Sequence, residues 1–325
     1  KQLKLGLPHE LVGHPVLSTY FEAFCAIDID VYIRFGMWDE LIAINVEQYY
    51  EPACMKDGIS IYPYTIAVTH YGHGIAYAVL GQIEQAKESY KHYIDAIQHI
   101  PSDCVRHNNK CSELVKIGVA MLLGELAYRE GNYSVGFQQL HIAVELSDML
   151  VYDEPWGWMV PPRHALGALY LEQGHVEGAI MQFTKDMDRH GMVGRAHPDN
   201  IWALGGLYRC YSKLLECDET GIGTGSGSGV DAGTGTNSIN TSIYPMVKRD
   251  RHDILNDMKL IWSKLVAMDG ATVACMCATV DRRVDLLPPP GSIDIITNTG
   301  SGSGSCSGIG SIVDSTSGTG GCCKK

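Results

Sequence analysis

Two histidines that could share a metal ion stand close together in the first half of the chain. His70 and His73 are three residues apart, a spacing that places both side chains on one face of a helix. Imidazole nitrogens are common ligands of transition metals, but a metal site needs three or four ligands that converge. Nothing in the sequence shows that further ligands converge on this pair. Metal binding therefore stays an alternative, no cofactor is predicted, and we expect hydrogen-bonded histidines of a core or groove.

A second candidate is the acidic and aromatic segment 152–158, which reads Tyr-Asp-Glu-Pro-Trp-Gly-Trp. Asp153 and Glu154 could work as an acid and base pair in hydrolysis, and Trp156 and Trp158 could stack on a ligand or cap a groove. The opposing interpretation, which we favour, is a long loop whose rings fill a hydrophobic gap. The sequence holds no evident set of nucleophile, base and orienting residue, so an enzyme stays open and a non-enzymatic function is favoured.

The elements that must position these residues are indicated by a short pattern that occurs three times. Each copy has two glycines seven residues apart, followed by apolar, small and bulky residues at matching offsets; the pairs are Gly74 with Gly81, Gly124 with Gly131, and Gly167 with Gly174. The first small residue lets two helices approach closely, and the second glycine ends the first helix in a left-handed conformation. A second helix then starts within a few residues, which predicts antiparallel helix hairpins that must stack to cover their apolar faces.

The repeated segments resemble tetratricopeptide repeats. The resemblance rests on GIAYAVLGQIEQAKESY, GELAYREGNYSVGFQQL and GALYLEQGHVEGAIMQF and covers roughly residues 15–215. It departs from the family in spacing, because the turn glycines Gly36, Gly81, Gly131 and Gly174 lie 45, 50 and 43 residues apart rather than about 34. The extra residues indicate loops inserted between the pairs. The arrangement also resembles bacterial tetratricopeptide proteins of unassigned function, in which a YDEP-type loop precedes a repeat. The resemblance implies an all-α solenoid of antiparallel helix hairpins.

The resemblance also implies where a partner would bind, because the first helix of each pair lines the concave groove in this family. We expect an unknown protein or peptide to bind there, and the chain to act as an interaction scaffold. Carried over by register, the partner-binding positions are Asp30, Arg34, Tyr71, Met121, Glu125, Tyr128, Arg129 and His164. The opposing interpretation is that these residues pack against the inserted loops and bind nothing. A metal-binding or hydrolytic protein that uses His70, His73 and the Asp153–Glu154 loop is the alternative function.

Composition excludes some classes of partner. The formal net charge is −12, and no cluster of Lys and Arg suits a phosphate backbone, so nucleic acid is not expected. No run of 18 apolar residues indicates a membrane span. The 11 cysteines form an odd count without framework spacing, which predicts reduced, buried thiols in a cytoplasmic protein.

Composition also divides the chain into five parts. We expect an extension, the repeat domain, an insertion rich in Gly and Ser, a helix that completes the last hairpin, and a tail that cannot form a core; they cover 1–14, 15–217, 218–250, 251–280 and 281–325. The insertion and the tail are predicted to be disordered.

Overall fold

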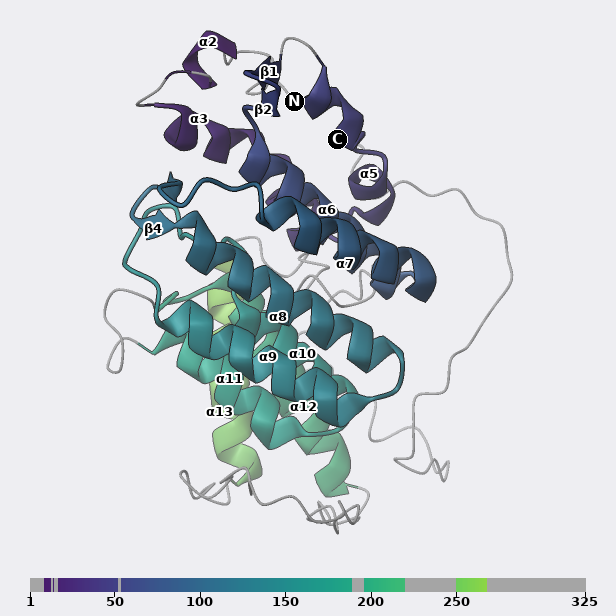
Figure 1. Ribbon diagram of the computed structural model, residues 1–325. Coiled ribbons are helices and arrows are strands. Elements are labelled where there is room, and N and C mark those ends of the chain that lie inside the picture. The colour runs from purple at the N-terminus through teal and green to yellow at the C-terminus, as the bar shows by residue number, and fades with distance from the viewer. Residues whose placement is uncertain are drawn as a thin grey trace.

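The computed structural model describes residues 9–12, 14, 17–51, 54–188, 196–219 and 250–267 of the 325-residue chain (Figure 1). Within these residues the regular structure is mostly helical, as predicted, and the strands form two hairpins of two-residue strands. The predicted disorder of residues 220–249 and 281–325 falls outside the described residues. None of the described helices is long and apolar enough to span a bilayer.

The chain begins with short helices and continues with long helices in pairs. The first group is α2 (His9–Val12), α3 (Ser18–Cys25), α4 (Ile27–Arg34), α5 (Trp38–Ile42) and the 3-10 helix η1 (Val46–Tyr50). The pairs are α6 (Pro63–Val79) with α7 (Ile83–Ile97), α8 (Cys111–Arg129) with α9 (Tyr133–Asp148), and α10 (Pro162–Glu172) with α11 (Val176–Met187). Proline opens α6 and α10, a position where its missing N–H has no partner within the helix in any case.

The turns within these pairs follow the glycine pattern. Gly81, Gly131 and Gly174 have φ angles of 75°, 82° and 79°, and Gly36, which follows α4, has a φ of 61°. A side chain beyond Cα would be strained at these angles, so the prediction that these glycines end helices in the left-handed region is confirmed. The helices also approach closely at the small residues: a Cβ on Gly136 of α9 would lie 3.1 Å from the carbonyl oxygen of Gly124 in α8.

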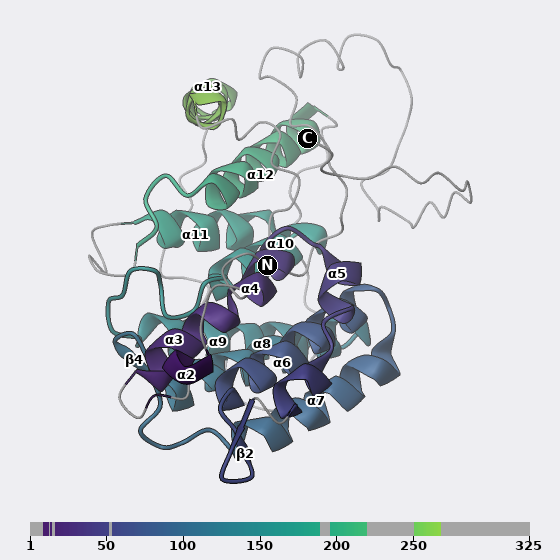
Figure 2. The same cartoon turned by 90° about the horizontal axis from the view of Figure 1, so that it is seen from above.

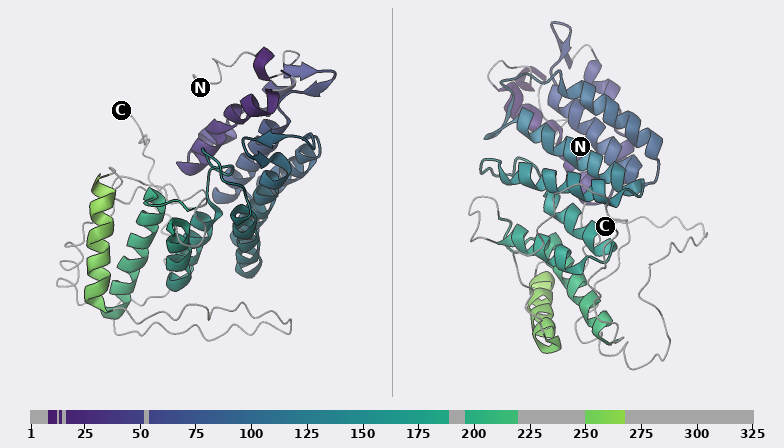
Figure 3. Two further views of the ribbon diagram at one scale, coloured as in Figure 1. Left: turned by 90° about the vertical axis from the view of Figure 1, so that its left-hand side faces the viewer. Right: turned by 60° about the horizontal axis from the view of Figure 1, so that its bottom comes forward.

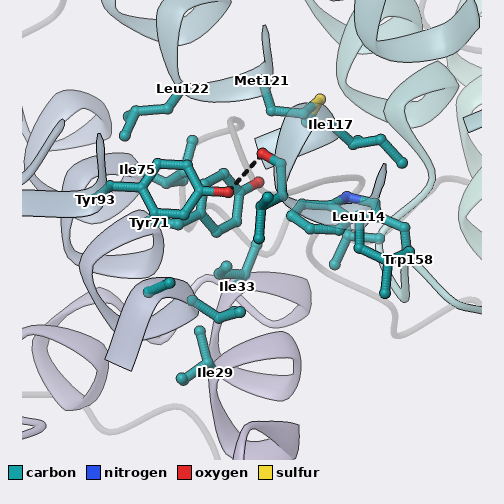
Figure 4. Packing of buried hydrophobic residues seen from close by; sticks show 14 of the residues in the cluster. Ile29, Ile33, Tyr71, Ile75, Tyr93, Leu114, Ile117, Met121, Leu122 and Trp158 are labelled. Carbon is teal, nitrogen blue, oxygen red and sulfur yellow. Dashed lines mark hydrogen bonds between the residues drawn. The ribbon is translucent and has the colours of Figure 1, made fainter. Parts of the chain in front are cut away.

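The main core joins α4 to the first two helix pairs (Figure 4). Ile29 and Ile33 of α4 are buried in the same cluster as Tyr71 of α6 and Tyr93 of α7. The Tyr93 hydroxyl donates a hydrogen bond of 2.7 Å to the carbonyl oxygen of Val115, which satisfies a polar group deep in the apolar interior. Helix α4, which precedes the helix pairs, is therefore part of the same core as the first two pairs.

A second core cluster closes the C-terminal end. Helix α12 (Ile201–Glu219) packs against α11 on one side and against α13 (Arg251–Ala267) on the other, as Figure 3 shows in its left panel. The rings of Tyr208 and Trp262 lie 5.6 Å apart between α12 and α13. Phe183 of α11 is buried against Gly167 and Gly206, whose missing side chains leave room for its ring. The helix that holds Trp262 thus pairs with α12 across a stretch of 31 residues, 220–250.

Two β-hairpins precede helix pairs at an interval of 50 residues. The first joins β1 (Met55–Lys56) to β2 (Ile59–Ser60), and the second joins β3 (Val105–Arg106) to β4 (Asn109–Lys110). A disulfide between Cys104 and Cys111, whose Cα atoms are 5.5 Å apart, closes the second hairpin. The prediction of reduced thiols is therefore wrong for these two cysteines, because the hairpin brings together residues seven apart. Cys54 and Cys210 are free and buried as predicted, and Cys25 is also buried.

Candidate functional site

The acidic and aromatic loop lies between α9 and α10 and is held by the second hairpin. The Asn109 side chain donates to the carbonyl oxygen of Val151 (3.0 Å) and accepts from the Val151 N–H (2.8 Å). Asp153 is buried, and its Oδ2 accepts from the Asn108 N–H at 3.0 Å and from the Asn109 amide at 3.3 Å. These hydrogen bonds satisfy the Asp153 carboxylate, so it fastens the loop to the hairpin.

Asp153 and Glu154 do not form the acid and base pair that the sequence left open. Glu154 is exposed and accepts a hydrogen bond from the Tyr152 hydroxyl, whereas Asp153 is buried at the hairpin. The tryptophans also differ. Trp158 is buried beside Tyr71, with ring centroids 5.2 Å apart, and fills a gap in the core as the loop interpretation expects. Trp156 is partly buried and lies against His197, with centroids 3.9 Å apart.

A pocket of about 370 Å³ opens beside this loop. Its walls come from the end of α9, the 150–161 loop, the start of α10, the end of α11, and the segment before α12. Aromatic and charged side chains share the lining, which includes Tyr152, Trp156, Trp158, Asp148, Asp153, Asp186, Asp188, Arg163, Lys185 and His197. Glu154 is not among the lining residues. The pocket therefore combines one part of the predicted loop with residues about 30 to 45 positions further along the chain.

A buried chain of hydrogen bonds runs from α4 to this pocket. Nη1 of Arg34 lies 3.0 Å from Nδ1 of His164, and Nε2 of His164 lies 2.8 Å from Oδ2 of Asp186. Oδ1 of Asp186 lies 2.7 Å from Nδ1 of His197. Arg34 also donates to the carbonyl oxygen of Met159 and lies over the Trp202 ring, 4.4 Å from its centroid. We call these four residues the Arg34–His197 chain.

The donors and acceptors of this chain determine its protonation. A guanidinium only donates, so Nδ1 of His164 accepts from Arg34 and its Nε2 carries the proton that is donated to Asp186. Burial, together with the charge of Arg34, lowers the pKa of His164 below its ordinary value. Burial alone would raise the pKa of Asp186, but the two imidazole donors outweigh it and hold that pKa well below the usual range. Asp186 is therefore an ionised acceptor that orients both rings.

Sequence reasoning missed Asp186 and His197. Asp186 lies near the end of α11, and His197 follows it by 11 residues in a segment without a repeat. No spacing rule for metal ligands or catalytic pairs joins two such positions. The one available signal was the pair of His164 and Arg34, which the sequence analysis placed on the same concave side without an interaction between them.

The predicted groove residues are mostly interior. Tyr71, Met121, Glu125, Tyr128, His164 and Arg34 are buried, and Asp30 is partly buried beside Arg106, whose guanidinium lies 3.2 Å away. Glu125 accepts from Arg129 at 2.8 Å, and the Tyr128 hydroxyl accepts from Gln173 at 2.8 Å. Most of the side chains expected to bind a partner are therefore covered by their neighbours, as where His164 of α10 lies against Arg34 of α4 (Figure 2). Their role in partner binding stays a prediction.

The histidine pair on α6 lies near a third histidine, His92 of α7. The rings of His70 and His73 lie 6.3 Å apart, and His92 of α7 approaches His70 to 5.1 Å. Burial and the two neighbouring histidines lower the pKa of His70 to about 4, so the ring is neutral near pH 7. Across the described ranges, no group of three or more His, Cys, Asp or Glu side chains is arranged to hold a metal ion.

Comparison of the chain with models of protein families, with curated proteins and with solved structures gave no match in any of the three.

Proposed function

We propose that the chain is a helical-repeat binding protein, of the tetratricopeptide kind, that holds an extended segment of a partner protein. Consecutive helix pairs with left-handed turn glycines support the repeat class. The proposed binding surface differs from the concave positions that the sequence indicated. It consists of the pocket and an apolar shelf at its rim, made by Met149, Val151 and Tyr152.

The apolar shelf carries the proposal. Met149, Val151 and Tyr152 are exposed by 65%, 60% and 52% of their surfaces, and Met149 is the most exposed large apolar residue of the described ranges. Val151 and Tyr152 line the pocket together with Leu150, which also packs on the core. Scattered exposed apolar residues are common, but three within four consecutive positions, two of which line a pocket, are typical of a surface that a partner covers.

The surroundings of the shelf favour a polypeptide partner. An extended segment could lay apolar side chains on Met149 and Val151 while one side chain enters the pocket. The net charge of −12 makes nucleic acid an unsuitable partner. An acid–base enzyme is less well supported, because in the described part of the chain no hydroxyl or thiol is hydrogen-bonded to His197. The cytoplasmic location stays a prediction, and the disulfide is a bond more typical of oxidising compartments.

Selection from a library of displayed random peptides tests this proposal. We expect the wild-type chain to enrich peptides with a shared apolar motif, and a Met149→Ser, Val151→Ser, Tyr152→Ser variant to lose them. The matched control is Ile59→Ser, which removes an apolar side chain with an exposed fraction of 63% from the first hairpin, away from the pocket. The proposal fails if no motif is enriched, or if the triple variant keeps the same peptides with unchanged affinity.

A further inference from the structure

The geometry points to a specific occupant of the pocket: we infer that it takes an alkylammonium group, supplied by a lysine side chain of the bound segment. This inference deepens the proposed function and rests on it for the source of the lysine. The pocket itself is a separate observation, because its shape and lining do not depend on whether a peptide covers the shelf.

The charge of the lining favours a cation. Among the described lining residues, four aspartates stand against two basic side chains, Arg163 and Lys185. Arg163 is bound to Asp148 and, at 3.0 Å, to Gln182, so its charge already faces a carboxylate of the same wall. A ligand with a positive charge therefore complements this lining better than an anion does.

His197 adds an acceptor that the rest of the molecule holds in place. Its Nδ1 donates to Asp186, which is itself fastened by His164 and Arg34. In the neutral ring the other nitrogen, Nε2, is an acceptor, and within the described ranges it has no hydrogen-bond partner. An ammonium N–H can donate to this nitrogen. The Arg34–His197 chain therefore does more than link helices, since it determines which ring nitrogen of His197 is left for a ligand.

The aromatic residues of the lining suit the alkyl part and the charge of the same group. Tyr152 and Trp156 both line the pocket, and the electron-rich faces of such rings attract cations. A lysine side chain could therefore place its methylenes on an indole and its ammonium near carboxylates and His197. A volume of about 370 Å³ is ample for this side chain.

Three small probes of similar size test the pocket without any partner. We expect n-butylammonium to bind, as seen by NMR in a shift of the Trp156 indole N–H signal assigned with Trp156→Phe. Neutral 1-butanol and anionic butyrate should bind at least about tenfold more weakly, a difference of about 1.4 kcal/mol. Equal binding of butylammonium and butanol, or tighter binding of butyrate, would overturn the inference.

Variants locate the binding. His197→Leu and Asp188→Asn should each weaken butylammonium binding several-fold, whereas Asp57→Asn should leave it unchanged. Asp57 is an exposed aspartate in the turn of the first hairpin and controls for the loss of one negative charge. A folded His197→Leu protein and a folded Asp188→Asn protein that both bind butylammonium like the wild type would place the amine elsewhere and refute the assignment.

Selected peptides then identify the source of the amine. Replacing their lysine by norleucine should reduce affinity at least about tenfold, and a peptide that keeps its affinity after this change refutes the lysine assignment. If the library gives no motif while butylammonium still binds at His197, the proposed function fails and the amine pocket stands alone, with a free amine as its ligand.

Discussion

The two β-hairpins have nearly the same local structure but different surroundings. Their strands pair in the same register, and the residue after each second strand donates to the carbonyl oxygen of the residue before the first, from Ile61 to Cys54 and from Cys111 to Cys104. Both turns use a positive φ, 52° at Asp57 and 53° at His107. The two hairpins thus share one backbone pattern in strand pairing and turn.

Their side chains show what differs. Lys56 is exposed, whereas its counterpart Arg106 is buried and contacts Asp30 at 3.2 Å and the Tyr64 hydroxyl at 3.0 Å. Ile59 is 63% exposed, whereas its counterpart Asn109 is 3% exposed and holds the 151–153 segment. The first hairpin lies on the surface, and the second joins α4, α6 and the pocket loop. The contrast teaches that one local motif acquires a structural role when the paired residues on one of its faces are polar and buried, as Arg106 and Asn109 are.

The largest expected difference between the hairpins concerns Arg106 and Lys56. Arg106→Ala leaves the partly buried Asp30 carboxylate without its ion-pair partner, and we expect a loss of about 3–5 kcal/mol in the free energy of unfolding. Lys56→Ala should change it by less than about 0.5 kcal/mol. Denaturant titration of both variants measures the difference. Similar small losses for the two would show that the second hairpin is not a tertiary link.

The disulfide gives the next largest difference. A cross-link that closes a loop of eight residues, 104–111, should stabilise the protein by about 2–3 kcal/mol through the entropy of the unfolded chain. Cys104→Ala combined with Cys111→Ala should lose this amount, and a reducing agent should lower the wild type to a similar level. Cys54→Ala, which removes a buried thiol from the first hairpin without a cross-link, is the matched control. Wild-type stability that ignores the reductant would contradict the bond.

A smaller effect is expected where the second hairpin holds the pocket loop. Asn109→Ala removes three hydrogen bonds to Val151 and Asp153 and should cost about 1–2 kcal/mol. It should also speed amide hydrogen exchange across residues 151–158. Ile59→Ala at the equivalent position should change neither quantity. Unaltered exchange in the Asn109 variant would mean that the loop keeps its conformation without the hairpin.

The smallest effect separates the helices that follow the two hairpins. Helix α6 begins with the Thr65 N–H donating to Oε1 of Glu22 at 2.9 Å, and burial raises the pKa of this carboxyl to about 8. Above the ordinary pKa of a glutamate, the unfolded chain has lost the Glu22 proton that the folded state still holds. The free energy of unfolding therefore falls as the pH rises toward 8. Between pH 6 and 7 we expect a loss of about 1 kcal/mol.

The same pH titration of Glu22→Gln provides the control. This variant keeps a hydrogen-bond acceptor for Thr65 but cannot ionise, so its stability should vary less over this interval. Helix α8, which follows the second hairpin, carries its own buried carboxyl at Glu125, whose pKa burial raises to about 7, so only the difference in slope between the wild type and Glu22→Gln reports on Glu22. If the glutamine variant shows the same slope as the wild type, another group causes the pH dependence.

Much of the helical framework could be predicted because its signals are local. A glycine at a turn with a φ near 80°, as at Gly131, reports a backbone conformation that other residues rarely adopt, and this requirement is visible in one sequence. Small residues at the crossing of α8 and α9 are similarly local, since Gly124 and Gly136 lie in consecutive helices. The hairpins were assigned to loops, because two-residue strands leave no periodic pattern.

The candidate site could not be predicted in the same way. Residue types alone group Tyr152, Asp153 and Trp156, but the Asp153 carboxylate accepts a hydrogen bond from Asn108 and fastens the loop to the second hairpin. The partner of Trp156 in the pocket is His197, and the partner of His164 is Arg34, 130 residues away. Contacts at such separations depend on how whole helix pairs stack, and neither composition nor spacing encodes them.

The sequence by itself thus determined the helix pairs and their turns, because left-handed glycines and close helix crossings are properties of a few adjacent residues. Only the tertiary structure decided that most of the positions expected to bind a partner lie in the interior. It also decided that Arg34, His164, Asp186 and His197 form one chain. The physical reason is that buried polar groups must find partners wherever packing brings them, and those partners need not be near in sequence.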